Sequence, residues 1–211
     1  MRLLAVVLSV CIPLIAFGYT SVIAKPTNQN TVLQIADIGS SQEFFGKLAN
    51  FPHTYEFTVQ TPVSLYAEVS VVDTQKQIND ASLIVVKEEK HGVSEIGRTN
   101  AKSELWKTYK DAMLAEAFRA GGHINAQLEK GTYRLEVSSP NNNAVYRLVL
   151  GTSKIKRGYF DNLRVLFEVR SFLGASPFTN VQSPLIYWPI VTILLLVVIG
   201  FVYMERKKRA T

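Results

Sequence analysis

Cysteine, histidine and charged residues are all scarce in this chain of 211 residues. It has one cysteine and three histidines, and 19% of its residues are charged against 47% that are hydrophobic. No pair of these residues has a metal-site spacing such as His-x-x-x-His or Cys-x-x-Cys, and no Gly-x-Ser-x-Gly or phosphate-loop motif occurs. We therefore expect a folded protein that is not an enzyme, with no catalytic residue, no cofactor and no bound metal.

Positive charge is concentrated at the two ends of the chain. The formal net charge is +6, from 23 basic and 17 acidic residues. Five of the basic residues are terminal and are opposed there by Glu205 alone: Arg2, Arg206, Lys207, Lys208 and Arg209. Without these six residues the chain has 18 basic and 16 acidic residues, a net charge of +2. This distribution is typical of membrane topology and argues against a nucleic-acid partner.

The N-terminal segment, residues 1–24, has the layout of a secretory signal peptide. An apolar stretch follows Met1 and Arg2, and small side chains stand at Val22 and Ala24, three residues and one residue before the expected cut. The prediction is cleavage after Ala24; the alternative is an anchor helix that is not cleaved. Cleavage would remove Cys11, so the exported domain would fold without a disulfide.

A second apolar run, residues 184–204, contains no charged residue and is long enough to span a bilayer as a helix. Aromatic side chains at its two ends, and the basic residues that follow it, are predicted to lie at the membrane interfaces: Tyr187, Trp188, Tyr203, Arg206, Lys207, Lys208 and Arg209. The basic tail, residues 205–211, is expected in the cytoplasm and the N-terminal domain outside it.

Short strand-like segments fill the region between the two ends. After a predicted N-terminal extension over 25–43, apolar and polar residues alternate or β-branched residues cluster in several segments, which are 55–59, 63–71, 81–87, 123–128, 131–138 and 144–150. Six or more short strands without long helices between them predict a mainly β fold, an antiparallel β-sandwich over 44–151.

The last two of these segments are predicted to pair as a hairpin. Tyr133, Leu135 and Val137 would face inward together with Tyr146, Leu148 and Leu150, and the Ser139–Asn143 connection contains turn-forming proline and asparagine.

Two segments have helical character. Residues 99–120 contain good helix formers, but a helix and an extended structure are left as equal alternatives there. Residues 159–173 predict an amphipathic helix within the juxtamembrane segment 152–183, with Asp161 as its N-cap. This helix could lie on the membrane surface, through Leu163, Arg164, Phe167 and Arg170, or it could pack against the sandwich with solvated arginines.

Three motifs resemble a known family. Phe57-Thr-Val through Leu65, then Gly122–Val137 with its Gly-Thr-Tyr-Arg-Leu-Glu-Val strand, then Tyr146–Gly151, are similar to the bacterial pre-peptidase C-terminal domain. The resemblance covers about residues 44–151 and implies a secreted jelly-roll-like β-sandwich, with the stretch from Trp106 to Arg119 extended. Such domains are accessory modules of peptidases and other exported enzymes, and some bind matrix polymers. We expect no catalytic domain beside the module here, which departs from the setting of that family.

These observations lead to an expected function. The chain is predicted to be a non-enzymatic single-pass membrane protein that displays a β-sandwich outside the cytoplasm and contacts lipid and an unidentified protein or polysaccharide. The alternative is an accessory subunit of an exported hydrolase or membrane transport complex, in which the sandwich docks onto another protein.

Overall fold

The computed structural model describes residues 16–73, 81–100, 106–151 and 155–209. Within them the chain divides into two compact units. One is built of β-strands from residues 17–111 and 116–155, and the other is mainly helical and combines residues 112–115 with the segment that begins at Lys156. The greater part of the predicted signal segment lies outside the described residues.

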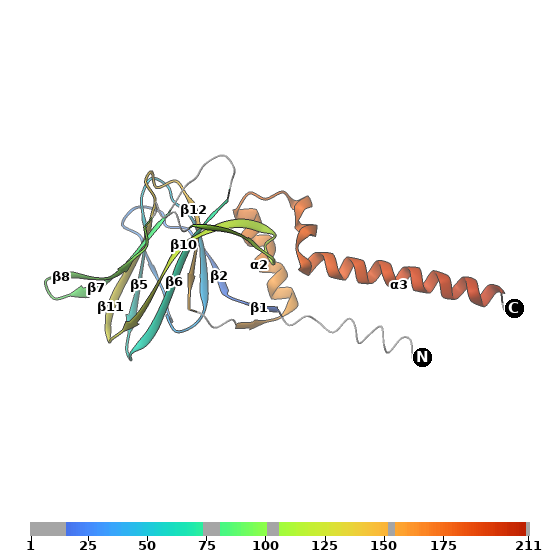
Figure 1. Ribbon diagram of the computed structural model, residues 1–211, viewed down its shortest axis with the longest axis horizontal. Coiled ribbons are helices and arrows are strands. Elements are labelled where there is room, and N and C mark those ends of the chain that lie inside the picture. Colours follow the sequence, from blue (N-terminus) through green and yellow to red (C-terminus); the bar gives the residue numbers. More distant parts are fainter. Residues whose placement is uncertain (1–15, 74–80, 101–105, 152–154, 210–211) are drawn as a thin grey trace. The chain divides into compact units, whose positions relative to one another are not determined.

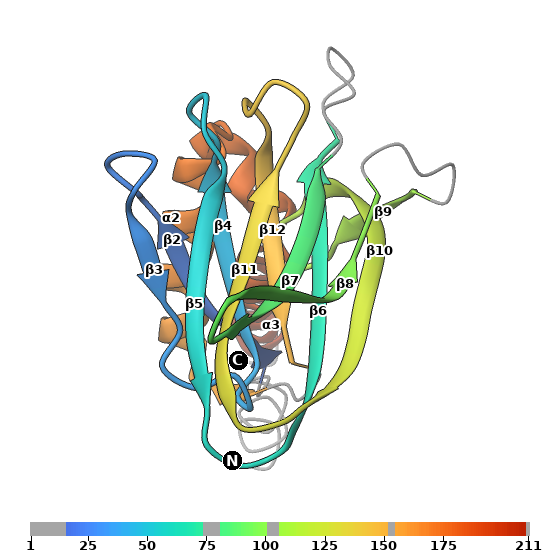
Figure 2. The ribbon, with the colours of Figure 1, turned by 90° about the vertical axis from the view of Figure 1, so that its left-hand side faces the viewer.

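The β unit is a sandwich of two sheets that pack face to face (Figure 1 and Figure 2). One sheet has six strands, in the spatial order β2 (Thr20–Ala24), β4 (Gln42–Lys47), β12 (Val145–Leu150), β6 (Val63–Val72), β10 (Glu116–Leu128) and β9 (Lys107–Asp111). The other has five, in the order β3 (Val32–Gln34), β5 (His53–Val59), β11 (Gly131–Ser138), β7 (Ser82–Glu89) and β8 (Gly92–Arg98). Two further short strands are β1 (Ala16–Gly18) and β13 (Ile155–Arg157).

Neighbouring strands are antiparallel except at one edge of each sheet. There β2 runs parallel to β4 and β3 runs parallel to β5. The predicted mainly β sandwich is therefore confirmed, and each of the six predicted strands is present. The sheets also include β2 and β3, which lie before residue 44, so the sandwich uses more of the N-terminal region than the motifs indicated.

The core lies between the two sheets and follows the period-two pattern of the sequence. On β6 the inward side chains are fully buried, namely Leu65, Ala67, Val69 and Val71. They meet Tyr55, Phe57 and Leu83 from the opposite sheet. Because alternate side chains of a strand point to opposite faces, Tyr66, Glu68 and Ser70 stand on the outer face of the six-stranded sheet.

The predicted hairpin between residues 131–138 and 144–150 is wrong. β11 pairs with β5 and β7 in the five-stranded sheet, whereas β12 pairs with β4 and β6 in the other. The connection, in which Asn142 has a φ of 43°, therefore crosses from one sheet to the other. The inward faces were predicted correctly, because an alternating pattern determines which side of a strand is buried but not which strand lies beside it.

Residues 99–120, for which the sequence left helix and extended structure open, contain strands and no helix in the part that the structure describes. Lys107–Asp111 forms β9 and pairs antiparallel with the start of β10, while residues 101–105 lie outside the described part. Pairing with neighbouring strands overrides the helix propensity of single residues here.

The helical unit contains α2 (Tyr159–Phe172), the 3₁₀ helix η1 (Pro177–Gln182) and α3 (Pro184–Arg209). The predicted juxtamembrane helix is confirmed, but its N-cap is Gly158 and Asp161 lies in the first turn. α2 ends at Phe172 with Leu173 as its C-cap, and the next residue, Gly174, has a φ of 74°, which suits glycine just after a helix C-terminus.

α3 contains the whole predicted span, and its 26 residues include an apolar window of mean hydropathy 2.7. Among the described residues it is the one helix long and apolar enough to cross a membrane. The helix could therefore anchor the chain in a bilayer.

Candidate functional site

A pocket of about 410 Å³ lies on the outer face of the six-stranded sheet. Its lining comes from β6, β9 and β12, together with the residue before β2 and the residue after β12: Tyr19, Tyr66, Glu68, Tyr109, Arg147, Val149 and Gly151. The volume lies in the range of about 300–1,000 Å³ that is usual for small-molecule sites. All of these residues belong to the sandwich unit.

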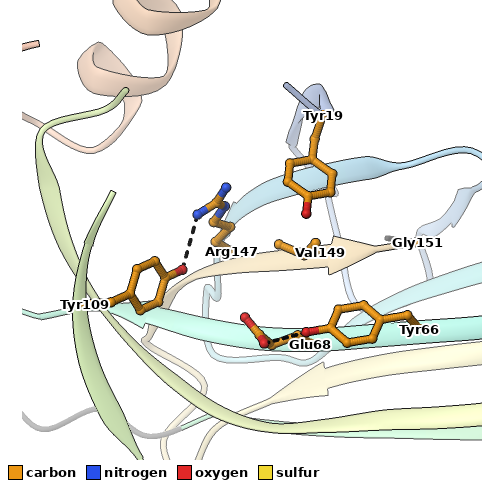
Figure 3. Close-up of a pocket in the computed structure, with 7 residues that line it drawn as sticks. All are labelled: Tyr19, Tyr66, Glu68, Tyr109, Arg147, Val149 and Gly151. Atoms are coloured by element: carbon orange, nitrogen blue, oxygen red, sulfur yellow. Dashed lines mark hydrogen bonds between the residues drawn. The ribbon is translucent and has the colours of Figure 1, made fainter. Parts of the chain in front are cut away.

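Three tyrosines surround the pocket and direct their hydroxyl groups into it (Figure 3). The Tyr66 hydroxyl donates to Glu68 Oε2 at 2.7 Å. Burial, and then the bond to the Glu68 carboxylate, raise the pKa of Tyr66 above its ordinary value. Burial also raises the pKa of Tyr19. Both phenols therefore stay protonated at neutral pH, and the proton of Tyr66 is held in the bond to Glu68.

Arg147 forms the wall of the pocket opposite Glu68, and its charge is already balanced. Its Nε donates to Glu43 Oε2 at 2.8 Å, and its Nη1 donates to Asp111 Oδ2 at 3.0 Å and to the Tyr109 hydroxyl at 3.2 Å. Burial lowers the pKa of Arg147, but the carboxylates of Glu43 and Asp111 more than offset it and hold the pKa above the ordinary value. The guanidinium is therefore a fixed hydrogen-bond scaffold in the wall.

The local charge of the pocket is negative. Glu68 lines the pocket, and the carboxylates of Glu43 and Asp111 pair with Arg147 in its wall, so three carboxylates accompany one arginine in this group of residues. An anionic ligand would meet net repulsion here, whereas a neutral ligand with many hydroxyl groups would find both donors and acceptors. The tyrosine rings add apolar surface with a polar edge.

The described part of the chain contains no group of three His, Cys, Asp or Glu side chains close enough together to hold a metal ion. The expectation that the protein is not an enzyme is not tested by this geometry and stays a prediction.

The residues predicted from the sequence lie elsewhere than this pocket. Tyr187 and Trp188 are half-exposed in the first turn of α3, Tyr203 is exposed near its end, and Arg206–Arg209 form its last turn. This placement suits the predicted interface roles, which remain predictions. Ala24, the predicted cleavage residue, is the last residue of β2 and is buried.

The four residues of the predicted membrane-surface helix do not share one environment. Arg164 and Phe167 are exposed on α2 and Leu163 is partly exposed. Arg170, by contrast, is 2% exposed and is hydrogen-bonded to Asn180 Oδ1 at 2.6 Å, to Thr179 and to the Leu114 carbonyl within the helical unit. Arg170 therefore holds both η1 and the turn at residues 112–115 against α2, and it is not available to a lipid surface.

Sequence reasoning missed the pocket, although one signal was present. Tyr66 and Glu68 occupy outward positions of an alternating strand, where a tyrosine next to a carboxylate is a candidate binding feature. Tyr19, Tyr109 and Arg147 come from distant parts of the chain, and only the strand order brings them to the same place.

Comparisons with known proteins give remote similarities only. No protein-family model and no curated protein sequence matches the chain. Among solved structures, it is similar to the pre-peptidase C-terminal domain of a collagenase from Bacillus anthracis, with 14% identity and a TM-score of 0.35, over 60% of this chain and 96% of that one.

Two other similar structures belong to different kinds of protein. A surface-associated copper-binding protein, CorA, from Methylomicrobium album BG8 matches 67% of this chain and 100% of its own, with 6% identity and a TM-score of 0.28. Murine APRIL matches 45% of this chain and 66% of its own, with 13% identity and a TM-score of 0.24. These values do not assign the chain to a family.

Proposed function

We propose that this protein is a non-enzymatic single-pass membrane protein whose exported β-sandwich binds a neutral sugar unit of a polysaccharide in the tyrosine pocket. α3 anchors it in the cell membrane, with the sandwich outside and the C-terminus in the cytoplasm. The observation that carries the ligand class is the convergence of three tyrosine hydroxyls and the Glu68 carboxylate around one pocket.

The chemistry of the pocket supports a neutral, hydroxyl-rich ligand. The Tyr66 hydroxyl already donates to Glu68 and the Tyr109 hydroxyl to Ser70, so these two tyrosine oxygens and the Glu68 carboxylate offer acceptors to a sugar hydroxyl. The Tyr19 hydroxyl can both donate and accept. The rings of Tyr19 and Tyr66 offer apolar surface to the carbon-bound hydrogens of a sugar. The carboxylates that surround Arg147 disfavour phosphate, sulfate and uronic acid groups.

The orientation proposed for the chain follows from its charge. The last turn of α3 contains four basic residues, Arg206, Lys207, Lys208 and Arg209, and such residues are retained on the cytoplasmic side of a membrane. The N-terminal sandwich would then face the side on which envelope polysaccharides are present.

Binding to oligosaccharides tests the proposal. We expect the full-length protein in lipid nanodiscs to bind at least one neutral oligosaccharide on an array that contains neutral and acidic glycans. Glu68→Gln should weaken that binding about tenfold, because a hydrogen bond to a charged group contributes about 1.5–3 kcal/mol.

Glu56→Gln is the matched control. Glu56 is also a carboxylate on a strand of the sandwich, but it lies on the five-stranded sheet and pairs with Arg134. Its replacement should leave the affinity unchanged. The proposal would be abandoned if only acidic glycans bound, if no glycan bound, if both variants bound equally well, or if the protein purified in mild detergent as a stoichiometric complex with an enzyme that occupied this pocket.

A further inference from the structure

β2 is an integral strand of the sandwich. Residues Thr20–Ala24 pair in parallel with Gln42–Gly46 along their whole length, and the backbone N–H of Thr20 donates to the Ser41 carbonyl at 3.1 Å. The Ser21 hydroxyl donates to the buried carboxylate of Glu43. Ala24 is 5% exposed and belongs to the core between the sheets.

Cleavage after Ala24 would remove this strand. β4, which lies second from the edge of its sheet, would become an edge strand, and its backbone groups between Gln42 and Gly46 would lose their partners on one side. The core would lose Ala24, the Glu43 carboxylate would lose the Ser21 hydroxyl, and the pocket would lose Tyr19. A mature chain that keeps these residues preserves the strand pairing, the core contact of Ala24 and the Tyr19 wall of the pocket.

A cleavage motif is present immediately before the strand. Two small residues, Ala16 and Gly18, stand at the third and the first position before the Gly18–Tyr19 bond. The apolar run Leu3–Ile12 then has a length usual for a signal peptide, and Pro13 separates it from the motif.

We propose that the signal peptide is removed by hydrolysis of the Gly18–Tyr19 peptide bond, so that the mature protein begins at Tyr19. A water molecule adds across the bond, which leaves a carboxylate on Gly18 and a free amino group on Tyr19. The mature chain then retains all of β2 and the Tyr19 wall of the pocket. It loses β1, the three-residue strand Ala16–Gly18, which pairs with β13 and belongs to neither sheet of the sandwich. The inference depends on export of the chain and not on which ligand the pocket binds.

The N-terminus of the full chain decides the question. The protein should be expressed with a C-terminal tag in a bacterial host that exports it, extracted from the membrane, and analysed by N-terminal sequencing and intact mass. We expect Tyr19 as the first residue. A first residue of Lys25, of Met1, or of any residue within β2 would overturn the proposal. A start at Met1 would leave the glycan proposal untouched, whereas a start within β2 or at Lys25 would also remove Tyr19 from the pocket.

Substitutions before each of the two possible cuts distinguish cleavage after Gly18 from cleavage after Ala24. Gly18→Gln and Ala16→Gln should each cause loss of the Tyr19 N-terminus and accumulation of the uncleaved precursor, because a signal peptidase requires small side chains there. Val22→Gln is the matched control, since Val22 stands three residues before the alternative cut and is 40% exposed on β2. Continued processing of Gly18→Gln, together with a block in Val22→Gln, would show that the cut follows Ala24.

Discussion

At the scale of single residues, Arg147 has the most demanding environment. The residue is 7% exposed. Its guanidinium contacts the carboxylates of Glu43 and Asp111 and lies 5.8 Å from the ring centroid of Phe45 and 5.5 Å from that of Phe118. The two carboxylates and the two aromatic rings together compensate the buried charge of the arginine. Removing one partner of a buried ion pair leaves the other charge without compensation.

Replacement of Arg147 should therefore destabilise the sandwich strongly. We expect Arg147→Met to lower the free energy of unfolding by about 3–5 kcal/mol, because Glu43 is 2% exposed and would keep an unpaired charge. Glu43→Gln in the same chain should restore part of the loss. Chemical denaturation in detergent, followed by tryptophan fluorescence, measures both effects.

Arg134→Met is the control for this prediction. Arg134 also bridges two carboxylates, of Glu56 and Glu88, but its side chain is 47% exposed and solvent screens the pairs. We expect a loss below about 1 kcal/mol. Equal losses for the two arginine variants would contradict the buried-pair argument.

At the scale of secondary-structure elements, α2 supplies a hydrogen bond that α3 lacks. Pro189 lies inside α3 and has no N–H, so the carbonyl four residues earlier, that of Leu185, has no intrahelical donor. The Tyr159 hydroxyl at the start of α2 donates to this Leu185 carbonyl at 2.8 Å. The proline is thus accommodated by a specific contact between the two helices.

A double-mutant cycle tests this contact. Tyr159→Phe should weaken the docking of α2 on α3 by about 1 kcal/mol, which corresponds to roughly fivefold faster amide hydrogen exchange in the first turn of α2. In a Pro189→Ala background the helix regains its own N–H donor, and the effect of Tyr159→Phe should be much smaller. Tyr203→Phe, at an exposed site near the other end of α3, should change nothing. An undiminished effect in the Pro189→Ala background would refute the role assigned to Tyr159.

At the scale of the whole sandwich, a buried network of hydrogen-bonded side chains joins the two sheets. His53 and Tyr55 come from β5, and Tyr146 comes from β12 of the opposite sheet. His53 Nδ1 and the Tyr55 hydroxyl each lie 2.7 Å from the Tyr146 hydroxyl, and Gly46 leaves room for the Tyr146 ring. Burial lowers the pKa of His53 to about 4 from its ordinary value of 6.5.

This shift makes the stability of the sandwich depend on pH. Below pH 6.5 the unfolded chain binds a proton at His53 that the folded chain does not bind until about pH 4, so stability falls as the pH falls through this window. The loss attributable to His53 should be about 3 kcal/mol between pH 7 and pH 4. Denaturation curves should show this loss in the wild type and a shallower dependence in His53→Gln.

The exposed residue His91 provides the comparison. His91→Gln should keep the wild-type dependence on pH, since the His91 side chain is exposed and not buried in the core. The assignment to His53 fails if His53→Gln retains the full loss of stability at low pH.

The sequence alone determined which faces of the strands are buried, where the apolar span lies and that a helix precedes this span. These features are local. The alternation of Leu65, Ala67 and Val69 can be recognised within a few residues of a strand, and the uncharged run from Pro184 within a few turns of a helix. Buried apolar surface dominates their energies, so the hydrophobic pattern is sufficient to predict them.

Only the tertiary structure decided which strands are neighbours, and with them the pocket. β11 and β12 are adjacent in the chain but belong to different sheets, and β2 pairs with β4 across a loop that contains β3. Tyr19, Tyr66, Tyr109 and Arg147 meet because of this order. The physical reason is that strand pairing satisfies backbone hydrogen bonds that every residue carries alike, so a strand's own side chains say little about its partner.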